Sequence, residues 1–172
     1  FTTRQAADAG YSSQLLLKHI RAGRVARTRR GIYRLVHFPA GEHEELVTAW
    51  LWSERAGVIS YQTALAFHGL SDALPSKKHL TVPAAWSKRR LRVPDGVVLH
   101  YADLAKVYVT WKGPVPVTTP LRTIVDCTAD AVAPDLVRQA ITQGVRRGLF
   151  SRDDVKRSTG IKSRKRAQSG TA

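Results

Sequence analysis

The chain has 172 residues, and its 28 Lys and Arg against 13 Asp and Glu give it a formal net charge of +15. Such a charge favours polyanionic partners, with nucleic acid first and an anionic membrane surface or an acidic protein second. A single cysteine excludes an intramolecular disulfide and any multi-cysteine metal site. No apolar run approaches the roughly 20 residues that span a bilayer, so we expect a soluble protein. The single cysteine favours a reducing, cytoplasmic setting, and the length allows one domain or two small ones.

Residues 3–35 have the pattern of a helix, a tight turn, a second helix and a β-hairpin. Thr2 or Thr3 is a suitable N-cap for a helix over residues 4–9, because a hydroxyl oxygen there accepts a hydrogen bond from the first turn. Gly10 ends that helix, since glycine adopts a positive φ without strain. The sequence contains no Met, and we therefore expect its natural start, and with it the first helix of a winged module, to lie upstream.

The second helix begins at Ser12 or Ser13 and extends to about Arg21, where residues 22–23 end it. The interval 10–12 has the length of the corner in a helix-turn-helix. One face of this helix is apolar, whereas another carries hydrogen-bond donors at positions i, i+4 and i+7. The expected apolar positions are Leu16 and Ile20, joined by Leu15 or Leu17. The donors are Gln14, Lys18 and Arg21.

A basic β-hairpin is predicted over residues 25–35. β-Forming residues flank a turn at 28–31, in which Gly31 takes the left-handed position. The hairpin contains no acid, and its arginines are Arg27, Arg29, Arg30 and Arg34. A merely solvated hairpin is the alternative, but so many arginines favour contact with a polyanion.

Acidic residues return after residues 37–41, and we place a domain boundary there. The predicted organisation is a winged helix-turn-helix over 1–37, a mixed α/β domain over 42–157 and a disordered basic tail over 158–172. The fold class is therefore α+β, with a small sheet and packed helices. In the second domain the predicted helices cover residues 44–55, 61–68, 121–130 and 134–147. The predicted strands cover 58–59, 78–82, 91–93, 97–102 and 107–111.

Three further features of the second domain have alternative interpretations. A basic loop at 87–90 is equally consistent with a solvated loop and with a second DNA contact. Cys127 falls on or near the apolar face of a helix, which favours a buried, inert thiol over a nucleophile. Arg122 and Asp126 lie four residues apart on that helix and can pair, either as a structural ion pair or as a polar anchor for the helical layer or a partner.

The sequence has none of the patterns that we associate with catalysis. Its acids do not form the Asp…Glu-x-Lys arrangement that holds Mg²⁺ in restriction-type nucleases. It also lacks a phosphate-binding glycine-rich loop, a nucleophile elbow and a His-Glu-x-x-His pair. We therefore expect a protein that is not an enzyme and that uses no cofactor or metal.

Three stretches of the chain occur in a distinctive order: residues 1–6 (FTTRQA) with 30–34 (RGIYR), residues 60–70 (SYQTALAFHGL) and residues 117–126 (VTTPLRTIVD). Together they resemble the AbiEi-type antitoxins of bacterial type IV, or abortive-infection, toxin–antitoxin systems. The resemblance implies a cytoplasmic protein of phage defence whose winged helix binds inverted repeats in its own promoter and represses the operon. It also implies a C-terminal domain needed for antitoxicity, and a nucleotidyltransferase toxin that is countered without a stable complex.

The leading hypothesis is therefore a sequence-specific repressor that binds double-stranded DNA. Residues at the start of the recognition helix lie closest to base edges in the major groove, and arginines of the wing contact phosphates or the minor groove. The candidate DNA-binding residues are Ser12, Ser13, Gln14, Lys18, Arg21, Arg27, Arg29, Arg30 and Arg34.

Two alternatives belong to other functional classes, and neither involves a membrane. In the first, the C-terminal domain neutralises the toxin by direct binding, and an exposed aromatic patch takes part. The candidates for that patch are Trp50, Trp52, Trp86 and Trp111. The second is RNA binding, for which we expect no exposed aromatic platform of the kind that stacks single-stranded bases.

Overall fold

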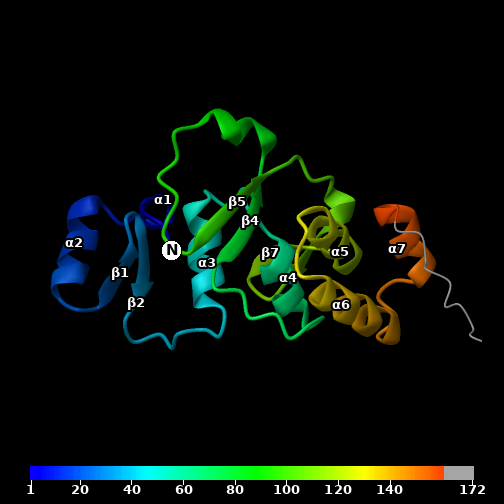
Figure 1. Cartoon of the computed structure of the whole chain (residues 1–172). Coiled ribbons are helices and arrows are strands. Elements are labelled where there is room, and N and C mark those ends of the chain that lie inside the picture. Colours follow the sequence, from blue (N-terminus) through cyan, green and yellow to red (C-terminus); the bar gives the residue numbers. More distant parts are fainter. Residues whose placement is uncertain (161–172) are drawn as a thin grey trace, which may run out of the picture. The chain divides into compact units, whose positions relative to one another are not determined.

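The computed structural model describes residues 1–160 (Figure 1). Within that range the chain is mixed α/β, with seven α-helices, a two-stranded sheet and a five-stranded sheet. It divides into two compact units: a sheet unit of Phe1–Ile59 and Lys77–Val117, and a helical unit of Ser60–Ser76 and the residues from Thr118 onward. The predicted division at residues 37–41 is a different partition and stays a prediction.

Two short helices open the sheet unit, α1 (Thr3–Asp8) and α2 (Ser13–Arg21). The Thr2 hydroxyl accepts a hydrogen bond from the Gln5 N–H at 3.2 Å, and the Gln5 side chain accepts one from the Thr2 N–H at 2.9 Å. This reciprocal capping box satisfies two backbone donors and fixes where α1 begins. The Ser12 hydroxyl caps α2 by accepting from the Leu15 N–H at 3.2 Å. Both predicted helices are confirmed.

A β-hairpin follows, in which β1 (Val25–Arg29) pairs antiparallel with β2 (Ile32–Leu35). The register shifts between Arg27 and Arg29, so the hairpin contains a bulge near its turn. Gly31 has a φ of +76°, as predicted. Its carbonyl accepts a hydrogen bond from the Thr3 N–H at 3.0 Å, which ties the turn of the hairpin to the start of α1.

A small apolar cluster holds these elements together. Its buried members are Ala6, Leu16 and Val25, and Phe1, Ile20 and Tyr33 pack against it. The expectation that Leu15 or Leu17 would join Leu16 is wrong, since their side chains are 38% and 50% exposed. Successive helical residues are rotated by about 100°, so both neighbours point outward once Leu16 faces the cluster.

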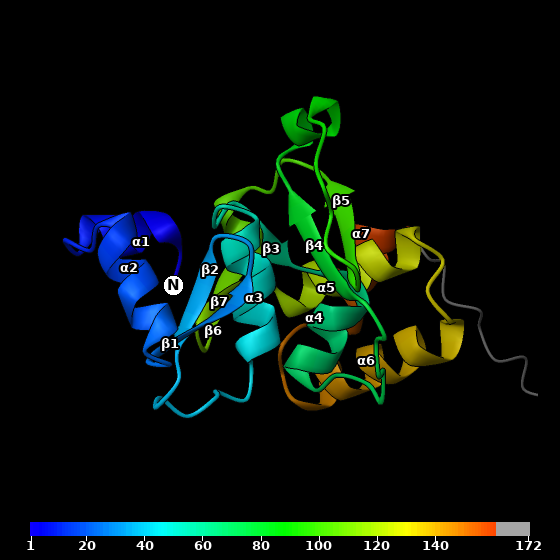
Figure 2. The same cartoon turned by 90° about the vertical axis from the view of Figure 1, so that its left-hand side faces the viewer.

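The five-stranded sheet has the order β5-β4-β3-β7-β6 (Figure 2). β3 is antiparallel to β4 and parallel to β7, whereas β4 and β5 are parallel to each other. α3 (Glu44–Trp52) packs against β3 and β4. The strand bounds are β3 (Val58–Ile59), β4 (Lys78–Val82), β5 (Val97–Tyr101), β6 (Val109–Lys112) and β7 (Val115–Thr118).

Three predicted elements of the sheet unit need correction. Residues 91–93 are not a strand, because β4 and β5 pair directly and the residues between them form the crossover that parallel strands require. The predicted helix 44–55 stops at Trp52, since Glu54 and Arg55 have positive φ values of 55° and 66°. β6 begins at Val109, after the 3₁₀ turn η2 (Lys106–Tyr108).

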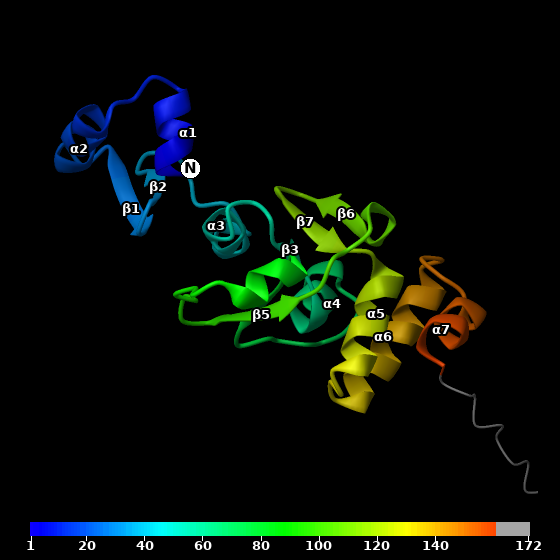
Figure 3. The ribbon, with the colours of Figure 1, turned by 90° about the horizontal axis from the view of Figure 1, so that it is seen from above.

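The helical unit is built from α4 (Tyr61–His68), α5 (Pro120–Ala129), α6 (Pro134–Arg146) and α7 (Arg152–Thr159). α5 is central and packs against the other three, as Figure 3 shows. α7 continues through Thr159, so the predicted tail from residue 158 starts too early, and its residues 161–172 lie outside the described part. None of the described helices is long and apolar enough to span a bilayer.

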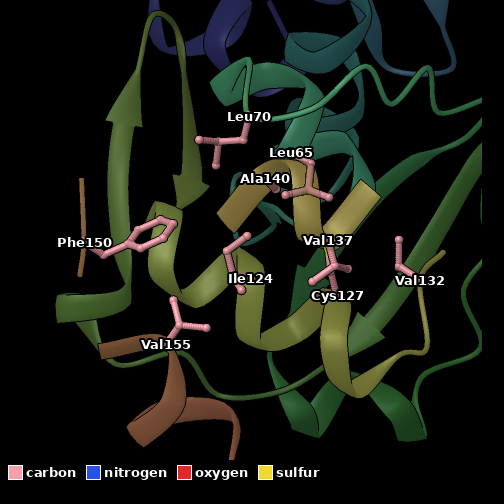
Figure 4. Packing of buried hydrophobic residues seen from close by; sticks show 9 residues of the cluster. All are labelled: Leu65, Leu70, Ile124, Cys127, Val132, Val137, Ala140, Phe150 and Val155. Carbon is pink, nitrogen blue, oxygen red and sulfur yellow. The ribbon is translucent and has the colours of Figure 1, made fainter. Parts of the chain in front are cut away.

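The buried cluster of the helical unit comes from all four helices and their loops (Figure 4). It contains Leu65, Leu70, Ile124, Cys127, Val132, Val137, Ala140, Phe150 and Val155. Gly144 admits the Phe150 ring so closely that a Cβ atom there would overlap it. The small residue therefore serves packing between α6 and the chain that follows it.

The predicted pair on α5 is present, but it is not an exposed one. The Arg122 Nε donates to the Asp126 carboxylate at 2.7 Å, and only 6% of the Asp126 side chain is exposed. Burial raises the pKa of Asp126 although the adjacent Arg122 guanidinium lowers it. The second carboxylate oxygen has no hydrogen-bond partner within residues 1–160. Arg122 therefore offsets a costly buried charge.

We predict that Arg122→Ala lowers the free energy of unfolding by about 3 kcal/mol at pH 8, because it leaves the buried Asp126 carboxylate unpaired. The loss of Arg122 raises the pKa of Asp126 further. Stability is then lost above that pKa and regained as the pH falls and the carboxyl is protonated. Urea unfolding followed by circular dichroism measures the loss of unfolding free energy at pH 8 and at pH 4. Arg138→Ala, which breaks an exposed pair with Asp135, should change little. An equal loss for Arg122→Ala at both pH values would contradict this account.

A second prediction concerns Cys127, whose side chain is fully buried and whose pKa burial raises to about 12. Because the thiolate is the reactive form, the native protein should not react with Ellman's reagent at pH 8. In denaturant it should release one equivalent of chromophore, since the chain has a single cysteine. Rapid modification of the native protein would show that the thiol is accessible and would reopen a nucleophilic role.

Candidate nucleic-acid interface

The outward face of α2 is a row of exposed hydrogen-bonding side chains. Gln14, Lys18 and Arg21 lie opposite Leu16 and Ile20 and are exposed. No carboxylate within residues 1–160 forms an ion pair with Lys18 or Arg21. The packing of Leu16 thus leaves the predicted donors on one accessible face.

Leu17 is a residue of this face that the sequence reasoning missed. It lies three positions after Gln14 and beside Lys18, and it is half exposed. The same spacing that groups Gln14, Lys18 and Arg21 also includes Leu17, but leucine was assigned to the buried side by its hydrophobicity alone. The face therefore combines donors with one apolar side chain.

The two serines at the start of α2 differ in what they can do. The Ser12 hydroxyl already accepts a hydrogen bond from the Leu15 N–H as the N-cap, so its acceptor function serves the helix. Ser13 is the first residue of α2, and its side chain is exposed. Of the pair, Ser13 is the one whose hydroxyl is not used in capping.

Arginines of the hairpin provide a second exposed group. Arg27, Arg29 and Arg30 are exposed, and no carboxylate within residues 1–160 lies at ion-pair distance from them. Arg34 differs, because it is only partly exposed and its guanidinium lies 3.5 Å from the Glu44 carboxylate. The structure thus brings three of the four predicted arginines together without an ion pair, although Arg29, after Lys78, helps to lower the pKa of Glu45.

The whole stretch of residues 1–36 is strongly basic. It contains eight Lys and Arg residues but a single acid, Asp8. Arg24, between α2 and β1, is also exposed and was not among the predicted residues, although it belongs to the same basic run. The electrostatic potential over these elements is therefore positive, as expected of a surface that meets phosphates.

The tryptophans do not form one exposed patch. Trp86 is buried with 8% exposure, and Trp50 and Trp52 are partly buried. Trp111 is 63% exposed and meets the Trp50 ring edge-on at 5.5 Å. Tyr101 and Tyr108 are also exposed, and the expectation that they and the tryptophans form no platform for stacking bases stays a prediction.

The part of the chain that the structure describes contains no cluster of metal-binding side chains. His, Cys, Asp and Glu side chains of residues 1–160 do not gather in groups of three or more that could hold an ion. His79 and His100 form a close pair, with Nδ1 and Nε2 2.9 Å apart. They are joined as hydrogen-bond donor and acceptor on β4 and β5.

Comparison with known protein families gives a similarity that falls on the elements just described. No curated protein is similar enough to the chain to count as a match. Residues 1–36 match the model of a protein family described as a transcriptional regulator, the AbiEi antitoxin. The predicted resemblance to this family is confirmed over that stretch. Over residues 1–36, which contain α1, α2 and the β1–β2 hairpin, the chain is therefore similar to the AbiEi antitoxin family of transcriptional regulators.

Proposed function

We propose that the protein is a DNA-binding transcriptional regulator in which α1, α2 and the β1–β2 hairpin act as a winged helix-turn-helix. The observation that carries this proposal is the outward face of α2, where Gln14, Lys18 and Arg21 are exposed beside a hairpin in which three of the four arginines form no ion pair within residues 1–160. An α-helix fits the major groove, and a neighbouring basic hairpin reaches the backbone or the minor groove.

In this proposal the first turns of α2 read base edges. The Gln14 amide suits an adenine edge and the Lys18 ammonium a guanine edge, while the Ser13 hydroxyl suits either. Leu17 lies on the same side and offers an apolar contact for a thymine methyl group. These four side chains give α2 a means of discriminating between sequences.

The arginines hold the sugar–phosphate backbone. Arg21, Arg27, Arg29 and Arg30 form no ion pair within residues 1–160, so no ion pair is broken when they bind a phosphate. If about six phosphates are neutralised, the logarithm of the binding constant falls with the logarithm of salt concentration at a slope of about −5. Arg34 reaches a phosphate only by leaving Glu44.

The family match to residues 1–36 supports a more specific proposal. The protein is an antitoxin of a type IV toxin–antitoxin system in a bacterial cytoplasm, where it serves phage defence. It represses its own operon by binding inverted repeats in the promoter, and its functional partner is a nucleotidyltransferase toxin. In this proposal residues 1–37 bind the DNA, residues 42–157 provide antitoxicity, and neither part is catalytic.

A second candidate function is neutralisation of the toxin by direct binding. The exposed Trp111 favours it, because a large aromatic ring that is 63% exposed and supported by the Trp50 edge is a typical anchor of a protein interface. Here DNA contact is secondary, and the surface around β6 carries the function.

Substitutions on α2 and on the hairpin should have different effects on DNA binding. Gln14→Ala or Lys18→Ala should reduce discrimination between the operator and random duplex by about 1–3 kcal/mol, because each removes a base contact. Arg29→Ala should weaken binding to both DNAs alike, since it removes a phosphate contact. Fluorescence anisotropy with the DNA upstream of the gene and with a shuffled duplex measures both quantities.

Arg138→Ala provides a matched control for these variants, because Arg138 is exposed but already paired with Asp135 on α6. It should leave both affinities unchanged. An identical loss on the two DNAs for Lys18→Ala would remove its base-reading role. Tighter binding of the wild-type chain to RNA than to the promoter duplex would overturn the proposal as a whole.

The second candidate predicts that the neighbouring gene product co-purifies with the chain at high salt and that Trp111→Ser abolishes this. The reason is that the substitution removes the exposed anchor while leaving the hairpin and α2 intact. Phe38→Ser is the control, because Phe38 is also exposed, at 71%. Absence of the complex with the wild-type protein, or equal loss with both variants, would count against direct binding.

A further inference from the structure

The connection between β4 and β5 is an ordered arch. The two strands are parallel, so residues 83–96 must return from the end of one to the start of the other. Its first part is η1 (Ala84–Lys88), which Figure 2 shows in green beyond the end of β4. The Ala84 N–H donates to the Asp103 carboxylate at 3.1 Å, and the buried Trp86 anchors the arch.

Hydrogen bonds within the arch fix its shape. The Ser87 hydroxyl donates to the Ala84 carbonyl at 2.8 Å, and the Arg89 N–H donates to the Trp86 carbonyl at 2.9 Å. The Arg89 guanidinium lies over the Trp86 ring at 4.3 Å, a cation–π contact. The backbone around these cations is therefore fixed, and the Arg89 side chain is held over Trp86 before any ligand binds, which lowers the entropy lost on binding.

Four cations are concentrated in this short segment: Lys88, Arg89, Arg90 and Arg92. All are exposed, the arch contains a single acid, Asp95, and no carboxylate within residues 1–160 forms an ion pair with the four cations. In the helical unit, by comparison, Arg122, Arg138, Lys156 and Arg157 are each paired with an aspartate, whereas Arg146 and Arg152 are exposed and form no ion pair within residues 1–160.

We propose that this arch binds backbone phosphates of duplex DNA without reading sequence, as a second contact besides α2 and the hairpin. Four adjacent like charges repel one another, and phosphates relieve that repulsion. Trp86, the single aromatic residue of 83–96, is buried, so the arch presents no ring for stacking on unpaired bases or for insertion into a bilayer. The inference rests on the proposed function in taking duplex DNA as the partner.

The test compares the wild-type chain with the variant Lys88→Ala/Arg90→Ala/Arg92→Ala, which leaves Arg89 on Trp86. Binding constants for the promoter duplex and for a shuffled duplex are measured by anisotropy between about 50 and 200 mM salt. Each lost phosphate contact reduces the salt slope by about 0.9, so the slope should become less steep by about 3 for both DNAs. The ratio of the two affinities should stay at the wild-type value.

The variant Arg138→Ala/Lys156→Ala/Arg157→Ala is the matched control, because it removes the same charge from exposed residues that are already paired. It should keep the wild-type slope. An arch variant with the wild-type slope, or a control variant with an equal reduction, would overturn the inference.

Two further outcomes separate this inference from the proposed function. In the first, the wild-type chain binds both duplexes with equal affinity, and the salt slope is still reduced only in the arch variant. This outcome would overturn the sequence-specific function and support phosphate binding by the arch. Absence of duplex binding by the wild-type chain would overturn both. If the arch variant lost affinity only for RNA or for anionic vesicles, the assignment of the arch to duplex DNA would be overturned.

Discussion

The packing of Leu16 with Ala6 and Val25 fixes the rotation of α2 about its axis, and the proposed interface depends on that rotation. With Leu16 inward, Gln14 and Lys18 must face solvent. A rotation by one residue would expose Leu16 and turn one of its neighbours inward. Three buried side chains therefore determine which functional groups are available to a ligand, although they take no part in binding themselves.

Charge pairing provides a second level of organisation. The carboxylates are too few to neutralise the cations, and where they lie decides which cations remain unpaired. In the helical unit, aspartates on α5, α6 and α7 each have a cationic partner, and in the sheet unit Glu44 and Glu45 pair with Arg34 and Lys78. Groups of cations without an ion pair are left on α2, the hairpin and the arch, where they are available to polyanions, and Arg146 and Arg152 add single unpaired charges on the helical unit.

Much of the fold could be predicted because local chemistry decides it. Thr2 and Ser12 have the cap positions, and Gly31 has the left-handed turn position that its residue type favours. What could not be predicted depends on distant partners. The exposure of Leu17 follows from the rotation of α2 that places Leu16 in the cluster, and residues 91–93 form no strand because they belong to the crossover that joins the parallel strands β4 and β5. Likewise, the sequence shows that Arg34 is basic, but it does not show that Glu44 lies beside it.

The hydrogen bond from the Thr3 N–H to the Gly31 carbonyl has a mechanical consequence. Thr2 also bridges to Ile32 on β2, so the tip of the hairpin is fastened to the first turn of α1 at two points. Without these two contacts, the basic hairpin would be freer to move relative to the helices. Fastened in this way, the hairpin is held against α1, so in the proposed DNA complex its reach would be set before a duplex binds.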